Sequence, residues 1–281
     1  MRVESLERVV ACMGSFAQVW ELAGGTLAGV SSDALTDYPE LHLPADVAVV
    51  GDFSAPSLEQ IAALEPTLVI MSGAAGGRGG SGSQADLAQP LEDMGIPALF
   101  FKVTVFDDYL RMLRACCDLT GRADLYEEHG ERVRARVSAV VDAAQAQVAA
   151  QGAPSVALMT TYSGGTRVQN SSTMTGAMLA DLGAANIADE DPSLLSDYSV
   201  EALIARDPDV IFVVPMGNDD VAAAKALAEQ TADDPAWAGL TAVAQGRFFT
   251  LDPRAFQYKP LNHWDESYRT LADDLFGADV A

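Results

Sequence analysis

The sequence predicts an α/β protein built from two similar αβ lobes that one long rigid helix joins. Three observations support this prediction: an internal repeat, apolar runs short enough to be buried parallel strands, and a proline-free helical stretch between the two copies. The chain has 281 residues, of which 49% are hydrophobic, so it is long enough to bury two separate cores.

The internal repeat is the most informative of these features. Ser57 to Ile70 aligns without a gap on Ser199 to Phe212, so that Glu59 coincides with Glu201, 142 positions later. Each copy reads as a short helix with a serine N-cap, a turn marked by proline, and an apolar strand. In the first copy, Gln60 follows Ser57 at the spacing of a capping box.

Looser matches flank the repeat. Gln18 to Gly24 resembles Ala177 to Gly183, and each reads as a helix end stopped by glycine. Gly95 to Phe101 and Gly246 to Leu251 each predict a strand entered from a helix. The two halves are therefore predicted to be Rossmann-like αβ lobes.

The stretch from Gly121 to Gln151 predicts one long helix, because it has no proline, Gly130 is its single internal glycine, and its apolar residues recur at helical spacing. At ~1.5 Å per residue such a helix spans about 45 Å. Gly152-Ala153-Pro154 ends it, and Ser155 to Thr160 predicts the first strand of the second half. The expected boundaries are residues 1–121 for the first lobe, 122–151 for the bridging helix and 152–281 for the second lobe.

The charge balance disfavours nucleic acid as a partner. Lys and Arg number 17 against 40 Asp and Glu, a formal net charge of -23 that would repel a phosphate backbone. No apolar run approaches the ~20 residues of a membrane helix. Met1 to Arg8 carries no signal-peptide core, so the chain is expected to be cytoplasmic or to have lost a signal segment.

Neither a catalytic centre nor a metal or cofactor site is predicted. The cysteines Cys12, Cys116 and Cys117 lack metal-ligand spacing and are expected to be structural thiols. The three histidines, His42, His129 and His263, stand at no metal-ligand spacing to one another and beside no plausible nucleophile.

Open parallel sheets bind ligands at the carboxyl ends of their strands, so two facing lobes predict a ligand cleft between them. The expected strand-end loops, among them Tyr162 to Arg167, suit a large ligand that is partly apolar and partly anionic. The candidate ligand-binding residues are Phe16, Phe53, Arg78, Lys102, Tyr162, Arg167, Met216, Arg254, Phe256 and Tyr258, with Lys259 as a further cation. The glycine-rich segment Gly73 to Ser83 lacks the Gly-Lys-Ser/Thr ending of a phosphate-binding loop and is expected to form a flexible lid or wall.

Several motifs resemble the helix-linked (class III) substrate-binding proteins of ABC importers for siderophores, haem and cobalamin. They are Val50-Gly51 leading to Leu58-Glu59, the run Glu65 to Ile70, Leu179 to Gly183 followed by Asn186-Ile187-Ala188, Pro235 to Arg247, and Lys259-Pro260 to Tyr268. The resemblance covers nearly the whole chain. It implies two αβ lobes with a ligand held between them and limited closure.

The same resemblance implies partners and a location. One glutamate on each lobe, here Glu59 and Glu201, would dock onto arginines of a membrane permease that works with an ATPase. The protein would be an extracytoplasmic monomer, with a lipid-anchored precursor. Docking is the favoured role of both glutamates, and complementation of the helix dipole at the helix starts is the alternative.

A chelated metal is the expected ligand. The branch of this family that binds bare manganese or zinc uses several histidines, and here only His42 could lie near a cleft. A ferric siderophore ranks first. Haem, for which Tyr162, Met216 and Tyr258 are candidate axial ligands, ranks second, and cobalamin third. A chelatase-like enzyme and a surface receptor or adhesin on the same scaffold are the alternatives of another class.

Overall fold

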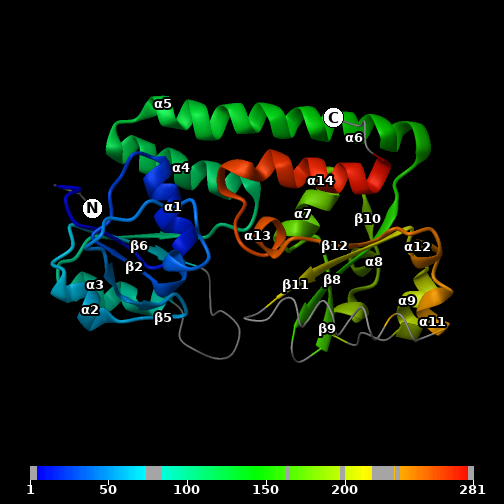
Figure 1. Cartoon of the computed structure of the whole chain (residues 1–281), viewed down its shortest axis with the longest axis horizontal. Coiled ribbons are helices and arrows are strands. Elements are labelled where there is room, and N and C mark those ends of the chain that lie inside the picture. The colour runs from blue at the N-terminus through cyan, green and yellow to red at the C-terminus, as the bar shows by residue number, and fades with distance from the viewer. Residues whose placement is uncertain are drawn as a thin grey trace. The chain divides into compact units, whose positions relative to one another are not determined.

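The computed structural model describes residues 5–73, 84–162, 165–196, 200–216, 231 and 235–277. The chain divides into two compact units, an N-terminal unit of Met1–Arg132 and a C-terminal unit of Val133–Ala281. Each unit contains its own β-sheet and its own helices (Figure 1). The predicted α/β class with two αβ lobes is confirmed.

The N-terminal unit has a five-stranded sheet in the order β3-β2-β1-β6-β7, and all its neighbouring strands are parallel. The strands are β1 (Val9–Ala11), β2 (Gly29–Val30), β3 (Ala48–Val49), β6 (Leu68–Ser72) and β7 (Ala98–Phe101). A small antiparallel hairpin of β4 (Gly51–Asp52) and β5 (Ala55–Pro56) follows β3. The helices of this unit are α1 (Gly14–Leu22), α2 (Leu58–Ala63), α3 (Ala88–Asp93), α4 (Phe106–Thr120) and α5 (Ala123–Tyr126), with 3-10 turns η1 (Ser32–Leu35) and η2 (Gln84–Leu87).

The C-terminal unit has a sheet in the order β10-β8-β11-β12, with β9 pairing antiparallel to β8. Its strands are β8 (Ser155–Tyr162), β9 (Gly165–Gln169), β10 (Ala185–Asn186), β11 (Val210–Pro215) and β12 (Phe248–Thr250). Its helices are α7 (Met174–Asp181), α8 (Ile187–Glu190), α9 (Val200–Arg206), α11 (Pro235–Ala238), α12 (Thr241–Ala244), α13 (Pro253–Phe256) and α14 (Trp264–Phe276), with 3-10 turns η4 (Pro192–Leu195) and η5 (Leu261–His263).

The internal repeat corresponds to a repeated piece of backbone. Ser57 accepts a hydrogen bond from Gln60 N at 3.3 Å, so the predicted N-cap of α2 is confirmed, while Ser199 lies outside the described residues. The turn after each helix places a non-glycine residue in the left-handed region, Glu65 at φ 45° and Asp207 at φ 40°. Each turn leads into a buried central strand, β6 or β11.

The two sheets repeat as well. The order β2-β1-β6-β7 in the N-terminal unit matches β10-β8-β11-β12 in the C-terminal unit, and every pairing in both series is parallel. The glycines predicted to stop α1 and α7 have positive φ, 82° at Gly24 and 84° at Gly183. The duplication therefore extends well beyond the segment that aligns in sequence.

The predicted long helix is present in three consecutive pieces. Helix α5 is followed by the π-helix η3 (Glu127–Glu131) and by α6 (Arg132–Gln151), so the helical stretch begins at Ala123 because Gly121 ends α4 at φ 72°. The hydroxyl of Tyr109 donates to His129 O within the π-helical turn, at 3.0 Å. The boundary between the units, after Arg132, falls inside this helical stretch, and the predicted division into three segments stays a prediction.

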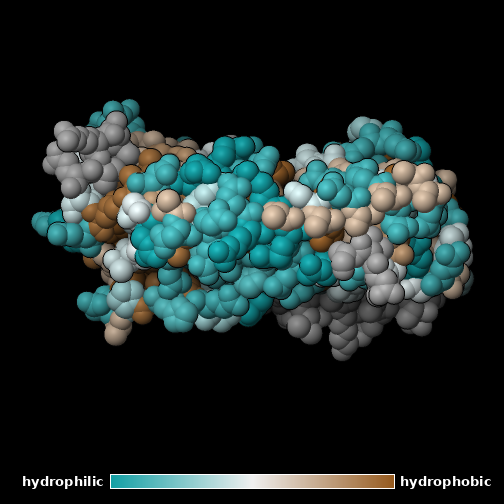
Figure 2. All heavy atoms as spheres, turned by 90° about the horizontal axis from the view of Figure 1, so that it is seen from above, coloured by the Kyte–Doolittle hydropathy of each residue, from teal (hydrophilic) through white to brown (hydrophobic). Residues whose placement is uncertain are grey.

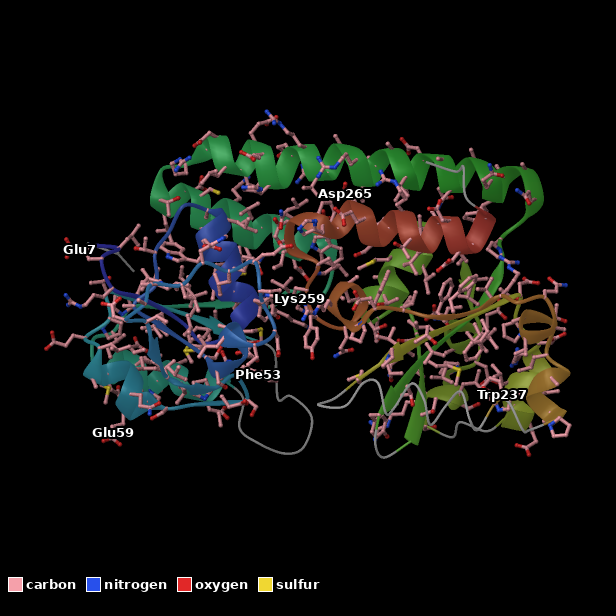
Figure 3. The ribbon with its side chains drawn as sticks, in the orientation of Figure 1. Glu7, Phe53, Glu59, Trp237, Lys259 and Asp265 are labelled. Atoms are coloured by element: carbon pink, nitrogen blue, oxygen red, sulfur yellow. The ribbon has the colours of Figure 1, made fainter. Side chains whose placement is uncertain are left out.

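Helix α6 is tied to α14 within the C-terminal unit. The guanidinium of Arg136 forms an ion pair with the buried carboxylate of Asp265, which Figure 3 labels on α14. The phenol of Tyr268 donates to Asp181 at the end of α7, at 2.5 Å. These contacts fix three helices of the unit to one another.

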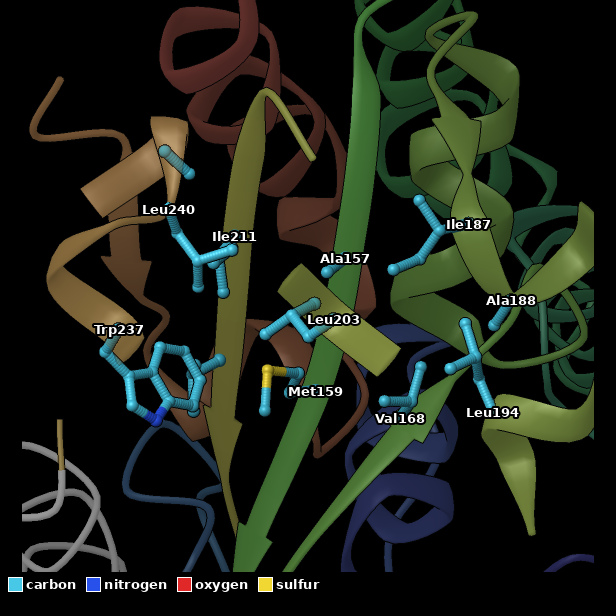
Figure 4. Close-up of a cluster of buried hydrophobic side chains, with 12 residues drawn as sticks. Ala157, Met159, Val168, Ile187, Ala188, Leu194, Leu203, Ile211, Trp237 and Leu240 are labelled. Carbon is cyan, nitrogen blue, oxygen red and sulfur yellow. The ribbon is translucent and has the colours of Figure 1, made fainter. Parts of the chain in front are cut away.

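Each unit has its own hydrophobic core. In the N-terminal unit, Val10, Val69 and Met71 from the sheet pack with residues of α2 and α3. In the C-terminal unit, Met159 and Ile211 from the central strands pack against Leu203 of α9 and Trp237 of α11 (Figure 4). Each sheet is thus packed against helices of its own unit, among them α2 and α9, the two helices of the predicted repeat.

Polar side chains dominate the face of the protein shown in Figure 2, in line with the net charge of -23. Among the residues that the structure describes, no helix is long and apolar enough to cross a membrane.

Candidate functional site

The carboxyl end of the N-terminal sheet brings together three of the predicted site residues. Phe16 lies in the first turn of α1, just after β1, and Lys102 directly follows β7. Phe53 occupies the turn of the β4-β5 hairpin and is 44% exposed (Figure 3). Arg78 and most of the glycine-rich segment lie outside the described residues.

Phe16 is a buried member of this group. It is 2% exposed, and its ring meets that of Phe101 edge to face, with centroids 6.4 Å apart. Its packing is that of a core residue, whereas Phe53 and Lys102 are exposed.

The start of α1 is held by an acidic side chain from another segment. Asp33 in η1 accepts a hydrogen bond from Gly14 N at 2.9 Å, which satisfies one of the free donors of the helix. A Cβ at position 14 would lie 2.4 Å from ring carbons of Tyr38, so only glycine fits there. Burial raises the pKa of Asp33, although its hydrogen bonds partly offset that rise.

The neighbouring thiol, that of Cys12, is buried. Burial, followed by the nearby Asp33 carboxylate, raises the pKa of Cys12 to about 12. Burial also raises the pKa of Cys116 to about 12 and that of Cys117 to about 11. All three cysteines are buried and unpaired, as expected for structural thiols.

The carboxyl end of the C-terminal sheet gathers a second group. Tyr162 ends β8, and the guanidinium of Arg167 on β9 lies 5.2 Å from the centroid of the Tyr162 ring. Met216 follows β11, is 5% exposed, and donates its backbone N–H to Thr161 O at 2.8 Å. Strand pairing therefore brings three predicted residues to one edge of the sheet.

The expected loop from Tyr162 to Arg167 is corrected by the structure. Tyr162 pairs with Gly165, so these residues belong to a β-hairpin of β8 and β9. An apolar run followed by Ser-Gly-Gly is typical of a strand that turns back on itself, which is the signal that the loop interpretation missed. A hairpin fixes Arg167 more firmly than a loop would.

The segment after β12 carries the remaining candidates. Asp252 caps α13 by accepting from Arg254 N at 2.9 Å, and the side chain of Arg254 is exposed. Phe256 is 4% exposed, and its carbonyl accepts from the Thr175 hydroxyl at 2.8 Å. Tyr258 and Lys259 are half-buried, and Figure 3 labels Lys259.

The two predicted docking glutamates are both exposed. Glu59 stands in the first turn of α2 and Glu201 in the first turn of α9. Negative charges in the first turn also complement the helix dipole.

Gln84 lies at the same end of the sheet as Phe53 and is not among the residues that the sequence predicted for the site. It is 7% exposed at the start of η2, and its amide bonds to three backbone groups at the sheet edge that carries Phe53. No local pattern marks it, because its partners lie 12, 31 and 72 positions away.

Metal-ligating side chains do not gather anywhere in the described part of the chain: no group of three or more His, Cys, Asp or Glu is placed to hold an ion. His42 lies 3.3 Å from Glu21, and His263 lies 3.0 Å from Glu266. Burial lowers the pKa of His129, which therefore favours the neutral ring.

Two αβ units of matched topology, with aromatic and cationic residues at their strand ends, define a bilobal binding protein. The sequence profile of the Periplasmic binding protein family matches residues 9–255, and the chain belongs to this family. The resemblance found in the sequence is thereby confirmed. Members of this family are periplasmic binding proteins, and membership implies an extracytoplasmic location.

Solved structures with the same fold are distant in sequence. The periplasmic heme-binding protein RhuT from Roseiflexus sp. RS-1 has a TM-score of 0.74 at 23% identity, with 97% of this chain and 98% of that chain covered. IsdE of S. aureus, complexed with heme, has a TM-score of 0.72 at 17% identity, with 96% and 98% covered. SirA of Staphylococcus aureus, complexed with staphyloferrin B, has a TM-score of 0.69 at 21% identity, with 98% and 94% covered. No curated protein sequence matches the chain.

Proposed function

We propose that this protein is the substrate-binding component of an ABC importer and that it captures a ferric siderophore for delivery to a membrane permease. The observation that carries the choice of ligand is the pair of Tyr162 and Arg167 on the β8-β9 hairpin. A guanidinium placed over an aromatic ring makes its cation–π contact through one face, and the N–H donors at its edges suit carboxylate or phenolate oxygens of an anionic chelate.

Other strand-end residues support the same ligand class. Lys102 and Arg254 are exposed cations at the carboxyl ends of their sheets, and Phe53 offers an exposed aromatic ring. Together they offer positive charge and apolar surface in an otherwise acidic protein. We predict that these residues contact the ligand and that the ligand lies between the two units.

Binding of a bare metal ion is disfavoured because the described residues hold no cluster of metal ligands. Haem is the second candidate. Two relatives of the same fold are described as heme-binding or heme-complexed, and one is complexed with staphyloferrin B. Met216 has the thioether that could serve as an axial ligand, although it is almost fully buried.

Direct titration tests the ligand. We expect one or more ferric siderophores, from a panel of carboxylate, catecholate and hydroxamate chelates, to bind with a Kd below about 1 μM by calorimetry. Haemin and cobalamin serve as competing ligands. Tight binding of haemin with a shifted Soret band, and no siderophore binding, would show that the ligand is haem and not a siderophore.

Arg167 gives the sharper test of the mode of binding. Arg167→Met should weaken siderophore binding by about tenfold or more, because a charge-assisted hydrogen bond to the chelate is lost. Arg269→Met, at an exposed arginine of α14 in the same unit, is the matched control and should bind as the wild type does. Equal affinity of both variants for the siderophore would show that Arg167 does not contact the ligand.

Delivery to a permease is tested separately. We expect Glu59→Lys combined with Glu201→Lys to abolish uptake by cells while leaving the affinity for ligand unchanged. The control is Glu92→Lys with Glu190→Lys, which reverses one exposed charge on each unit elsewhere. Undiminished uptake by the first double variant would refute the docking role.

A further inference from the structure

The strand ends of β1 and β6 separate at a defined rung of the ladder. Cys12 N donates to Ile70 O at 2.9 Å, in continuation of the parallel pairing of Ala11 with Ile70. In a regular parallel ladder the next hydrogen bond would run from Ser72 N to Cys12 O. Here the side chain of Gln84 stands between those two groups.

The amide of Gln84 replaces that rung. Its Oε1 accepts from Ser72 N at 2.7 Å, and its Nε2 donates to Cys12 O at 2.7 Å. A carboxamide has the same donor and acceptor groups as a peptide, so it can be inserted between two backbones without leaving either group unpaired. The insertion spreads the two strands at the edge where parallel sheets bind their ligands.

The second hydrogen of Nε2 reaches a third segment. It donates to Phe53 O at 2.6 Å, in the turn of the β4-β5 hairpin. That turn is also braced from within, because Asp52 accepts from Ser54 N at 2.9 Å and from its hydroxyl at 2.6 Å. Gln84 therefore anchors, through the Phe53 backbone, a hairpin whose aromatic ring is exposed.

We propose that Gln84 is a positioning residue of the ligand site: its amide serves as a rung between β1 and β6 and holds the Phe53 ring where the ligand meets the N-terminal unit. The inference rests on the proposed function in taking Phe53 as a ligand contact. Other side chains cannot do the same. Glu has no donor when ionised, Met has no amide, and Asn is one methylene shorter.

Hydrogen–deuterium exchange without ligand tests the anchoring step. Gln84→Met keeps the length and volume of the side chain but loses three hydrogen bonds. We expect faster exchange in peptides covering residues 51–56 and 68–73, with exchange in the C-terminal unit unchanged. Gln89→Met is the control, because Gln89 lies on the exposed surface of α3 and bonds only to the nearby Asp93 among the contacts described. Wild-type exchange rates in both peptides of the Gln84 variant would overturn the proposal.

Ligand titration tests the positioning step, with a ferric carboxylate, a ferric catecholate and a ferric hydroxamate siderophore and haemin as probes. For whichever probe binds the wild type, Gln84→Met should bind roughly tenfold more weakly and Gln89→Met equally well. Altered exchange with unchanged affinity would overturn the positioning role. If no probe binds the wild type, the proposed ligand class fails, and the exchange result alone decides whether Gln84 anchors the hairpin.

A pH profile separates positioning from general loss of stability. In Gln84→Glu the ionised carboxylate would face two carbonyl oxygens, and protonation would restore one donor. Because burial raises the pKa of a carboxyl group, we expect the affinity of this variant, relative to wild type at the same pH, to recover as the pH falls from about 8 to about 5. A ratio that does not change with pH would contradict the proposal.

Discussion

At the scale of single residues, one side chain in each copy of the repeat binds the start of the central strand to the start of the neighbouring strand. Asp209 accepts from Ser155 N and from the Ser155 hydroxyl, both at 2.8 Å. At the equivalent place in the N-terminal unit, Thr67 bonds to both backbone groups of Arg8, at 3.2 Å each. Two different side chains thus close the same gap between neighbouring strands.

Removal of the Asp209 side chain should destabilise the C-terminal unit. Asp209→Ala leaves the half-buried Ser155 N–H without its acceptor, and we expect a loss of about 1 to 3 kcal/mol in the free energy of unfolding by urea. Asp142→Ala, at an exposed carboxylate of α6, should change stability by less than about 0.5 kcal/mol. Equal stability of the two variants would contradict this role.

Asp274 predicts a pH-dependent stability. Burial, and next the neighbouring Asp273, raise the pKa of Asp274 to about 6 from its ordinary 3.8. The folded state therefore holds a proton that the unfolded state releases, so stability is lost as the pH rises through about 4 to 6.

Asp274→Asn should remove this loss. We expect its Tm to exceed that of the wild type by about 2 °C at neutral pH, after allowance for partial exposure, and the difference to vanish near pH 3.5. Calorimetric scans across this range measure it. A gain that is the same at every pH would rule out titration as the cause.

Residue-level prediction from sequence succeeded where the interaction is local. The cap from Ser57 to Gln60 spans three positions and leaves a recognisable pattern. Gln84 leaves none, since its bonds to Cys12 and Phe53 depend on how distant segments fold together. Burial of Phe16 was also invisible, because an aromatic residue after a strand fits a binding wall as well as a core.

At the scale of elements, the two turns of the repeat use one backbone geometry with different side-chain roles. Glu65 and Asp207 both adopt positive φ, which is strained for a residue with a Cβ. The Glu65 side chain is exposed, and its carboxylate makes one long ion pair with the guanidinium of Arg8, at 4.0 Å. Asp207 instead accepts from Thr241 N at 2.8 Å and from its hydroxyl at 2.7 Å.

The same substitution should therefore act differently in the two turns. Glu65→Gly should stabilise the protein by about 1 kcal/mol, because glycine relieves the strain and little else is lost. Asp207→Gly should not stabilise, since it also removes the cap on α12. Chemical unfolding of both variants measures the contrast, and an equal gain from both would disprove it.

Elements were the level at which the sequence predicted most. Apolar runs bounded by Pro and Gly gave β6, β8 and β11, because a central parallel strand is buried on both faces. The π-helical turn Glu127–Glu131 was not predicted, and Tyr109 of another helix donates a hydrogen bond to its His129 carbonyl, a contact that no local pattern reveals. The β9 strand was read as a loop because it is short and polar.

At the scale of the whole molecule, repulsion among carboxylates is the dominant electrostatic feature. A net charge of -23 on 281 residues favours expanded states and weakens the compact one. Salt shortens the Debye length from about 30 Å at 0.01 M to about 3 Å at 1 M. Added salt should therefore favour the folded chain.

We expect Tm to rise by several degrees between about 0.01 M and 1 M sodium chloride. Choline chloride at equal ionic strength is the control, and an equal rise in both salts identifies screening rather than binding of sodium. A Tm that stays constant or falls in both salts would show that repulsion does not limit stability.

Because its native thiols are buried, the protein is suited to selective labelling at an introduced cysteine. Cys12, Cys116 and Cys117 are buried, and burial raises the pKa of each thiol, so we expect little reaction of the native chain with maleimide reagents. A cysteine that replaces an exposed strand-end residue would then react with a fluorophore while the native cysteines do not. A fluorophore at that position would report binding of a chelate in real time, and no residue of the core would need to be substituted.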